Sequence, residues 1–196
     1  GMFTRKYIGR TLLLMLLFVC ITPAGFLLTT WTTQLLKMLG FSVADSLTAM
    51  TIISIGVPAG CFLNSIVSDM GGRKLPLAIL GVLAAVSSFI FGGMSSLMLL
   101  TLAGFMVTVF NMALNFTLFS YTAESYPTRM RNTATGFHNG LARLSVSASQ
   151  PLIPMIHAAY GFVGIFTSVA ILFFLPVIPL LIWGKKTGGK SLEEIE

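Results

Sequence analysis

Charged residues are scarce in this chain of 196 residues, of which only 9% are Asp, Glu, Lys or Arg. Ordinary soluble domains carry roughly 25% charged residues, because a surface exposed to water needs them. The shortage excludes a soluble enzyme, a nucleic-acid-binding domain and a disordered tail. It indicates that hydrocarbon covers most of the folded surface, in line with the 55% of residues that are hydrophobic.

Catalytic and covalent motifs are also missing. The sequence contains no Gly-x-Ser-Gly turn, no His-Glu-x-x-His and no paired aspartates inside an apolar run, which disfavours an intramembrane enzyme. Both cysteines lie inside apolar runs, so no disulfide framework is expected. We therefore expect neither enzyme activity nor a cofactor or metal.

Long apolar runs occupy most of the chain. A bilayer core about 30 Å thick takes roughly 20 helical residues, which leaves room for about six crossings. The runs predict an all-α membrane protein with transmembrane helices at about 12–36, 47–67, 75–91, 97–121, 133–159 and 162–183. These helices would form one domain, residues 1–183, followed by a polar cytoplasmic tail, residues 184–196.

The positive charges lie almost entirely on one side of this arrangement. Ten of the twelve Lys and Arg residues precede the first run, follow the second or fourth, or follow the last. Loops rich in Lys and Arg stay in the cytoplasm, so both termini are expected there, with the protein in the cell inner membrane. The net charge of +6 then reflects orientation and does not indicate a nucleic-acid partner.

The turn between the second and third runs carries opposite charges around glycines. Asp69 follows one run, and Gly72, Arg73 and Lys74 open the next. Such a hairpin can exchange ion-pair partners, or it can be a charged turn among lipid headgroups. Charge and spacing alone favour neither interpretation.

A second charged turn follows the fourth run, where Glu124 precedes Pro127, Arg129 and Arg131. This Glu-x-x-Pro-Thr-x-x-Arg pattern resembles a signature of major facilitator superfamily transporters, especially their sugar porter, organic ion and aromatic acid branches. The turn at 65–74 resembles the superfamily's Gly-x-x-x-Asp-x-x-Gly-Arg-Lys motif, with Ser65 in place of the first glycine. The segment 190–195 is similar to the end of sugar porters.

The resemblance implies the carboxy-terminal half of a twelve-helix transporter. Its partner would be a missing amino-terminal half or a second copy in a homodimer, within the lipid bilayer. The resemblance assigns a gating charge cluster to the residues of the two turns: Asp69, Gly72, Arg73, Lys74, Glu124, Pro127, Arg129 and Arg131.

The expected helix at 133–159 carries a polar stripe. At 100° per residue, Asn139, Arg143 and Gln150 lie within about 40° of one another. A charged side chain near the middle of a membrane helix costs about 2.5–3.5 kcal/mol on insertion scales. Arg143 therefore either pairs inside the protein to hold helices together or faces a central cavity and binds an anionic group with its planar fork. The resemblance to the aromatic acid branch favours binding.

Other polar side chains lie inside the apolar runs. Asn111 and Asn115 are one turn apart and suit interhelical hydrogen bonds or substrate hydroxyls equally well. Trp31 and Gln34 belong to a polar and aromatic band near the outer end of the first helix. Trp31 is either an interfacial anchor or a lid over the cavity. The candidate substrate contacts are Arg143, Asn139, Gln150, Asn111, Asn115, Trp31 and Gln34.

The combined prediction is a secondary active transporter that moves a small, anionic organic metabolite by alternating access. No carboxylate lies deep in an expected helix, so a proton symporter would need its principal proton carrier outside these residues. One alternative is a half-length membrane interaction or assembly protein without transport activity. A sugar transporter half is another, although the paired glutamines and the Asn-Trp pair of sugar porters are missing.

Overall fold

The computed structural model describes residues 3–5, 7–67 and 72–184. Within these residues the chain is helical and forms no strand. The helices are α1 (Ile8–Met38), α2 (Val43–Val67), α3 (Lys74–Gly93), α4 (Leu97–Ser125), α5 (Thr128–Ser149), α6 (Leu152–Phe174) and α7 (Val177–Trp183). The all-α fold class predicted from the sequence is confirmed.

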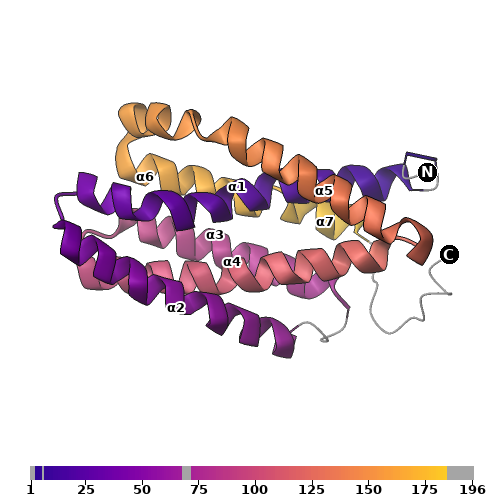
Figure 1. Ribbon diagram of the computed structural model, residues 1–196, viewed down its shortest axis with the longest axis horizontal. Helices are drawn as coiled ribbons and strands as arrows, with labels where there is room; N and C mark the ends of the chain where they lie inside the picture. Colours follow the sequence, from indigo (N-terminus) through magenta and orange to yellow (C-terminus); the bar gives the residue numbers. More distant parts are fainter. Residues whose placement is uncertain (1–2, 6, 68–71, 185–196) are drawn as a thin grey trace.

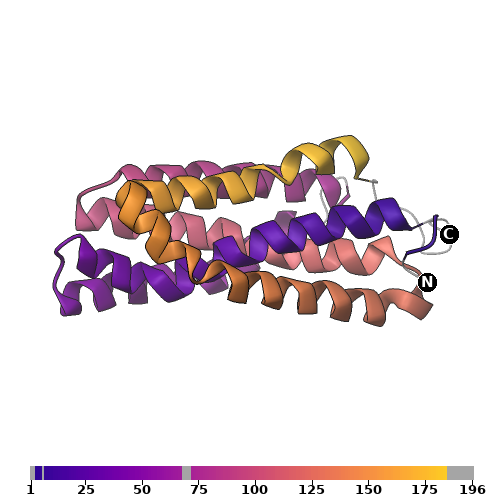
Figure 2. The ribbon, with the colours of Figure 1, turned by 90° about the horizontal axis from the view of Figure 1, so that it is seen from above.

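The helices lie side by side along the long axis of an elongated bundle (Figure 1). α5 packs mainly on α1, α2 packs mainly on α4, and α3 lies between α4 and α6. Seen from above, α3, α6 and α7 lie on one side of the bundle, and α2 and α5 lie on the other (Figure 2). α1 begins and α7 ends at the same end of the bundle, where α4 also gives way to α5.

Aromatic and aliphatic side chains fill the space between these helices. Phe18 of α1, Phe91 of α3 and Phe166 of α6 are all at most 1% exposed. The rings of Phe91 and Phe166 lie 4.4 Å apart between centroids, which holds α3 against α6. Many large apolar residues also remain on the outer surface, including Phe62 at 70% and Trp183 at 72% exposure. An apolar surface this extensive suits lipid better than water.

The expectation of a membrane-spanning bundle fits the hydropathy of the helices. Five helical segments among the described residues are long and apolar enough to cross a membrane, with α6 and α7 counted as one. α5 is not among them, although its 22 residues span about 33 Å at 1.5 Å per residue. α5 is therefore long enough to cross a membrane but more polar than the other long helices.

Several helix boundaries differ from the predicted ones. α1 extends beyond 12–36, and α5 begins at Thr128 instead of 133. The expected helix at 133–159 is interrupted between α5 and α6 at Pro151, which has no N–H to continue the hydrogen-bond ladder. Gly161 lies inside α6 and interrupts its helical geometry, so the chain reverses direction there. Its φ of 65° is one that glycine adopts without steric cost. The last helix is likewise divided, at Pro176, into α6 and α7. Residues 185–196 of the predicted tail lie outside the described residues.

Two glycines on α2 allow this helix to approach α4 closely. A Cβ atom at Gly56 would lie 2.9 Å from the carbonyl oxygen of Phe105, and one at Gly60 would lie 2.5 Å from that of Val109. Since backbone oxygens cannot move aside cheaply, only glycine fits at either position. α2 is thereby positioned against α4 over most of its length, although little of its surface is buried.

Candidate functional site

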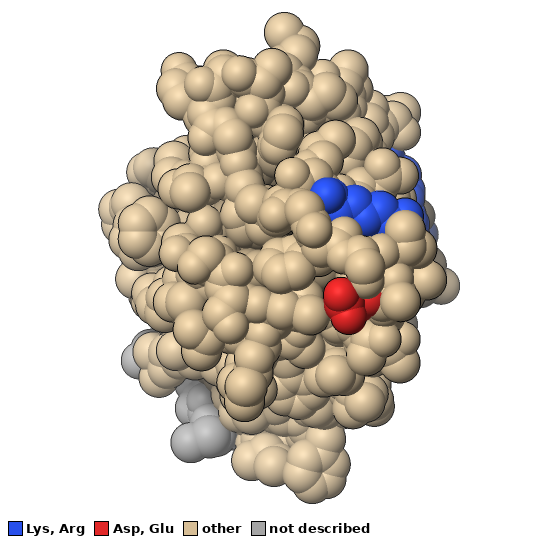
Figure 3. All heavy atoms as spheres, turned by 90° about the vertical axis from the view of Figure 1, so that its left-hand side faces the viewer, with Lys and Arg blue, Asp and Glu red and all other residues tan. Residues whose placement is uncertain are grey.

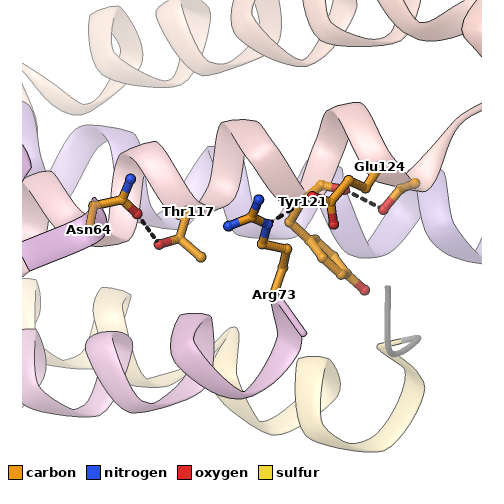
Figure 4. Close-up of polar contacts among 6 residues, drawn as sticks. Asn64, Arg73, Thr117, Tyr121 and Glu124 are labelled. Atoms are coloured by element: carbon orange, nitrogen blue, oxygen red, sulfur yellow. Dashed lines mark hydrogen bonds and ion pairs between the residues drawn. The ribbon is translucent and has the colours of Figure 1, made fainter. Parts of the chain in front are cut away.

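An ion pair joins the two charged turns that the sequence singled out. The Nε–H of Arg73, at the start of α3, donates to the Glu124 carboxylate near the end of α4 over 2.8 Å (Figure 4). The two side chains are only 20% and 26% exposed. The second carboxylate oxygen of Glu124, Oε2, is buried without a hydrogen-bond partner. Glu124 can therefore accept a further donor while it holds Arg73.

The other described members of the predicted gating cluster lie in the same two turns or at the start of the helices that follow them. Pro127 ends the link from α4, and its carbonyl accepts the N–H groups of Met130 and Arg131 in the first turn of α5. Arg129 is exposed, whereas Arg131 is half-buried with its Nε and Nη2 atoms unpaired. Gly72 precedes α3 with a φ of 97°.

Lys74 begins α3, and its ammonium group has no ion pair within the described part of the chain. Asp69 lies outside the described residues. The structure thus brings Arg73 and Glu124 together and leaves the cations of the second turn without carboxylate partners among the residues it describes.

Charge is concentrated at the end of the bundle that contains this pair. We call it the charged end; its described charged residues are Arg5, Arg10, Arg73, Lys74, Glu124, Arg129 and Arg131. The opposite end, at the turn from α1 to α2, carries Lys37 and Asp45. Figure 3 faces that end and shows small charged areas on a surface that is otherwise uncharged.

A second set of contacts at the charged end was not predicted from the sequence. The Arg10 guanidinium donates through Nη1 to the Ser125 carbonyl over 2.9 Å, and the Thr11 and Tyr126 hydroxyls are 2.8 Å apart. Both contacts join α1 to the end of α4 across 115 residues of sequence. Burial raises the pKa of the Tyr126 hydroxyl, although its bond to Thr11 and the Arg10 charge act against the shift. Tyr126 therefore stays neutral at physiological pH.

His138 of α5 is completely buried against α1. Its Nδ1 lies 2.7 Å from the Ala134 carbonyl, and its Nε2 lies 3.3 Å from the Thr11 carbonyl. Both partners are carbonyls, which can only accept, so each contact is a hydrogen bond where that ring nitrogen carries a proton. The position suits a packing residue that fixes α5 on α1.

Arg143 lies on the opposite face of α5 from this contact. Its side chain is exposed, and Asn139, one turn before it, is half-buried. Ser147, one turn after it, donates only to the Arg143 carbonyl, over 3.2 Å. Among the described residues, the Arg143 guanidinium has no hydrogen bond or ion pair. The described residues thus give the Arg143 guanidinium no partner, and its role in binding stays a prediction.

Two of the predicted substrate contacts form a hydrogen bond with each other. The Trp31 indole N–H of α1 donates to the Gln150 side-chain carbonyl, just past the end of α5, over 2.8 Å. The Gln150 amide also donates to the Val146 carbonyl over 3.2 Å. Gln34, one turn beyond Trp31, is exposed. The pair joins α1 to the end of α5, at the end of the bundle away from the charged turns.

The asparagines of α4 satisfy one another. The Asn115 amide donates to both the backbone carbonyl and the side-chain oxygen of Asn111, each over 2.9 Å. Asn111 is buried against α1, where a Cβ at Gly25 would lie 2.6 Å from its amide oxygen. Nearer the charged end, the Thr117 hydroxyl donates to Asn64 over 2.8 Å and links α4 to α2 (Figure 4). The hydrogen bonds between Asn111 and Asn115 lie within α4, and Asn115 keeps a partly exposed face.

The fold and this arrangement of polar groups define a class of protein. Membrane-length helices, ion-paired turns gathered at one end and polar side chains inside the bundle are typical of a multi-pass membrane transport protein. The model of the Major Facilitator Superfamily matches residues 2–151. The chain belongs to this superfamily, as the two turn motifs predicted, and is a multi-pass protein of the cell membrane.

Relatives with named functions are transporters. The chain is 28% identical over 194 residues to the putative niacin/nicotinamide transporter NiaP of Bacillus subtilis, covering 98% of this chain and 48% of the relative. It is 26% identical to the niacin transporter NiaP of Acinetobacter baylyi, covering 97% of this chain and 44% of the relative. It is also 25% identical to the inner membrane metabolite transport protein YdjE of Escherichia coli, covering 99% and 43%. The chain thus spans about half the length of the curated relatives it matches.

The fold also matches a solved transporter structure. A crystal structure of the peptide transporter POT, an E310Q mutant in complex with alafosfalin, superimposes with a TM-score of 0.74. The match covers 92% of this chain and 39% of that chain at 15% sequence identity. Identity this low carries information about the fold alone.

Proposed function

We propose that this chain forms the six-helix, carboxy-terminal half of a secondary transporter that moves a small anionic organic metabolite by alternating access. The observation that carries the proposal is the position of Arg143. Its guanidinium lies exposed in the second half of α5, and the described residues provide it with no ion pair.

A cation in this position cannot face hydrocarbon cheaply. Insertion of an arginine at the centre of a membrane helix costs about 2.5–3.5 kcal/mol. A water-filled cavity between two six-helix units would remove most of that cost, and a bound carboxylate would pair with the guanidinium through two parallel hydrogen bonds. Asn139, on the same face one turn away, adds an amide for a second polar group of the substrate. The exposed face of α5 is therefore assigned to the cavity and the second unit.

The names of the relatives suggest a pair of probes. Niacin carries a carboxylate at neutral pH, whereas nicotinamide carries an uncharged amide in the same place. The Bacillus subtilis relative is named for both compounds and the Acinetobacter baylyi relative for niacin. A site built around Arg143 would prefer the carboxylate, because an amide offers no charge and only one acceptor oxygen.

The ion pair at the charged end supplies a gate for alternating access. We assign the charged end to the cytoplasmic side, in accordance with the positive-inside rule. Arg73 and Glu124 hold α3 and α4 together there in one state, and transport requires this pair to open. Arg129 and Arg131 are the cations available to Glu124 when Arg73 leaves. No proton carrier is assigned, because the described carboxylates, Asp45 and Glu124, lie at helix ends.

The test measures uptake of labelled niacin by cells that express the complete transporter. Loss of a bidentate, charge-assisted contact costs about 1.5–3 kcal/mol, so Arg143→Gln is expected to weaken apparent affinity about 10- to 150-fold. The apparent affinity of Arg143→Lys should fall between those of the wild type and Arg143→Gln, because lysine keeps the charge and loses the planar fork. Lys37→Gln is the matched control, an exposed cation removed from the same bundle without an expected effect.

Competition with nicotinamide separates a substrate contact from a structural role. The wild type should prefer niacin, and Arg143→Gln should lose that preference. Wild-type kinetics in Arg143→Gln would return Arg143 to packing. Equal losses for niacin and nicotinamide in that variant would indicate damage to the fold.

A further inference from the structure

A groove at the charged end, on the outside of the bundle, contains features of a lipid site. It has a volume of about 540 Å³ and lies between the first turns of α1 and the end of α7. Its lining residues are Arg5, Gly9, Arg10, Leu12, Leu13, Leu16, Pro179 and Trp183. These residues are separate from the ion pair of α3 and α4 and from the exposed face of α5.

Charge in the groove has a single sign. Arg5 and Arg10 are the ionisable lining residues, and the first turn of α1 contains no acid. Arg10 uses Nη1 on the Ser125 carbonyl, but its Nε is buried without a hydrogen-bond partner. The start of a helix adds a partial positive charge of its own. The groove therefore attracts an anion, and the exposed Arg5 side chain is available to bind it.

The polarity of the groove changes along α1. Arg5, Gly9 and Arg10 lie at the start of the helix, while Leu12 and Leu16 continue down the same side. Gly9 and Leu16 are separated by about 10 Å along the helix axis. Trp183, which is 72% exposed, faces the groove from the end of α7, as an aromatic residue at the headgroup level of a membrane does. The lining thus matches a molecule with an anionic head and apolar chains.

We infer that this groove binds an anionic phospholipid of the adjacent leaflet, with its phosphate at Arg5 and Arg10 and an acyl chain along Leu12 and Leu16. Basic pockets between helices at the cytoplasmic face are a recognised form of lipid headgroup site. The inference rests on the membrane location of the protein and does not depend on its substrate. A soluble metabolite would gain nothing from the apolar half of the groove.

Gly9 offers a direct way to block the site. A Cβ at this position would meet no atom within 4 Å, so a larger side chain would extend into open space without disturbing the protein. Gly9→Phe is expected to fill the upper part of the groove, and Gly9→Ala is the matched control that adds a single methyl group. Arg5→Gln removes charge from an exposed residue.

The experiment is native mass spectrometry of the purified protein, titrated with phosphatidylglycerol or phosphatidylcholine. The wild type should bind its first phosphatidylglycerol at least tenfold more tightly than phosphatidylcholine. Arg5→Gln should weaken phosphatidylglycerol binding about fivefold, as expected for one cation near an anionic lipid, and leave phosphatidylcholine unchanged. Gly9→Phe should abolish the preference, while Gly9→Ala and Lys37→Gln should keep it.

Other occupants give different results. Displacement of phosphatidylglycerol by glycerol 1-phosphate would identify a site for soluble phosphate esters and overturn the lipid assignment. A wild type without preference for the anionic lipid, as expected if another protein segment covers the groove, would also overturn it. So would a preference that survives both Arg5→Gln and Gly9→Phe. If Gly9→Phe fails to fold, as judged by circular dichroism, the Arg5→Gln result decides.

Discussion

The ion pair between Arg73 and Glu124 makes a quantitative prediction. Exposed ion pairs contribute about 0–1 kcal/mol, whereas breaking a fully buried pair costs about 3–5 kcal/mol. Arg73 and Glu124 are 20% and 26% exposed and are in contact at 2.8 Å, so they lie between these limits. We expect an interaction energy of about 2 kcal/mol, within that range. Arg73 is the only ion-pair partner of Glu124 in the described structure, and the second oxygen of Glu124 already has no hydrogen-bond partner. Loss of Arg73 therefore leaves a partly buried carboxylate without an ion pair.

A double-mutant cycle measures this energy. Arg73→Gln, Glu124→Gln and the double variant would be unfolded by SDS in dodecyl maltoside micelles and followed by tryptophan fluorescence. The loss of unfolding free energy in the double variant should be smaller than the sum of the two single losses, and the difference is the interaction energy. Lys74→Gln is the control, because this neighbouring cation has no ion pair among the described residues. Single effects that add to within about 0.5 kcal/mol would refute the pair.

Three further predictions follow from contacts between helices. Gly60→Leu should destabilise the protein by about 1–3 kcal/mol through overpacking against the α4 backbone, measured as a lower unfolding temperature, while an unchanged temperature would contradict the close contact. Tyr126→Phe should cost about 0.5–1.5 kcal/mol through the lost bond to Thr11. Because burial raises the pKa of Tyr126, the stability that its neutral hydroxyl contributes is complete below pH 10 and is lost above it. Tyr126→Phe should therefore lose less stability than the wild type when the pH is raised above 10. An identical pH profile in the two proteins would argue against burial of the hydroxyl. Trp31→Phe should free Gln150 and increase labelling of cysteines introduced near the outer end of α5, and unchanged labelling would show that the pair does not close the bundle.

Much of the fold could be predicted from hydropathy and charge. The apolar runs and their order follow from the length of helix needed to cross a bilayer, and the turn motifs identified the superfamily that the family model confirms. The interruption at Pro151 was not predicted, because proline is tolerated inside membrane helices when neighbours satisfy the freed carbonyls. Whether the helix continues or breaks at Pro151 depends on how the segment before Gly161 packs, which the local sequence does not determine.

The candidate site was predicted less completely. Arg73 and Glu124 were identified as members of one cluster, but a pairing across 51 residues needs the fold. Trp31 and Gln150 were predicted as separate substrate contacts, yet the structure joins them across 119 residues. The contact between Thr11 and Tyr126 was missed, because a threonine and a tyrosine at helix ends carry no sequence signal for one another. Asp69 remains a prediction, since it lies outside the described residues.

The most direct test of the account asks whether substrate reaches the exposed face of α5. Ser147 lies one turn from Arg143, is exposed and bonds only within its own helix, so Ser147→Cys should report on this face without disturbing the fold. In a background without Cys20 and Cys61, niacin should slow the labelling of this cysteine by a water-soluble maleimide severalfold, nicotinamide should not, and Arg143→Gln should remove the protection. Equal labelling with and without niacin would contradict the assignment of this face to an anionic substrate.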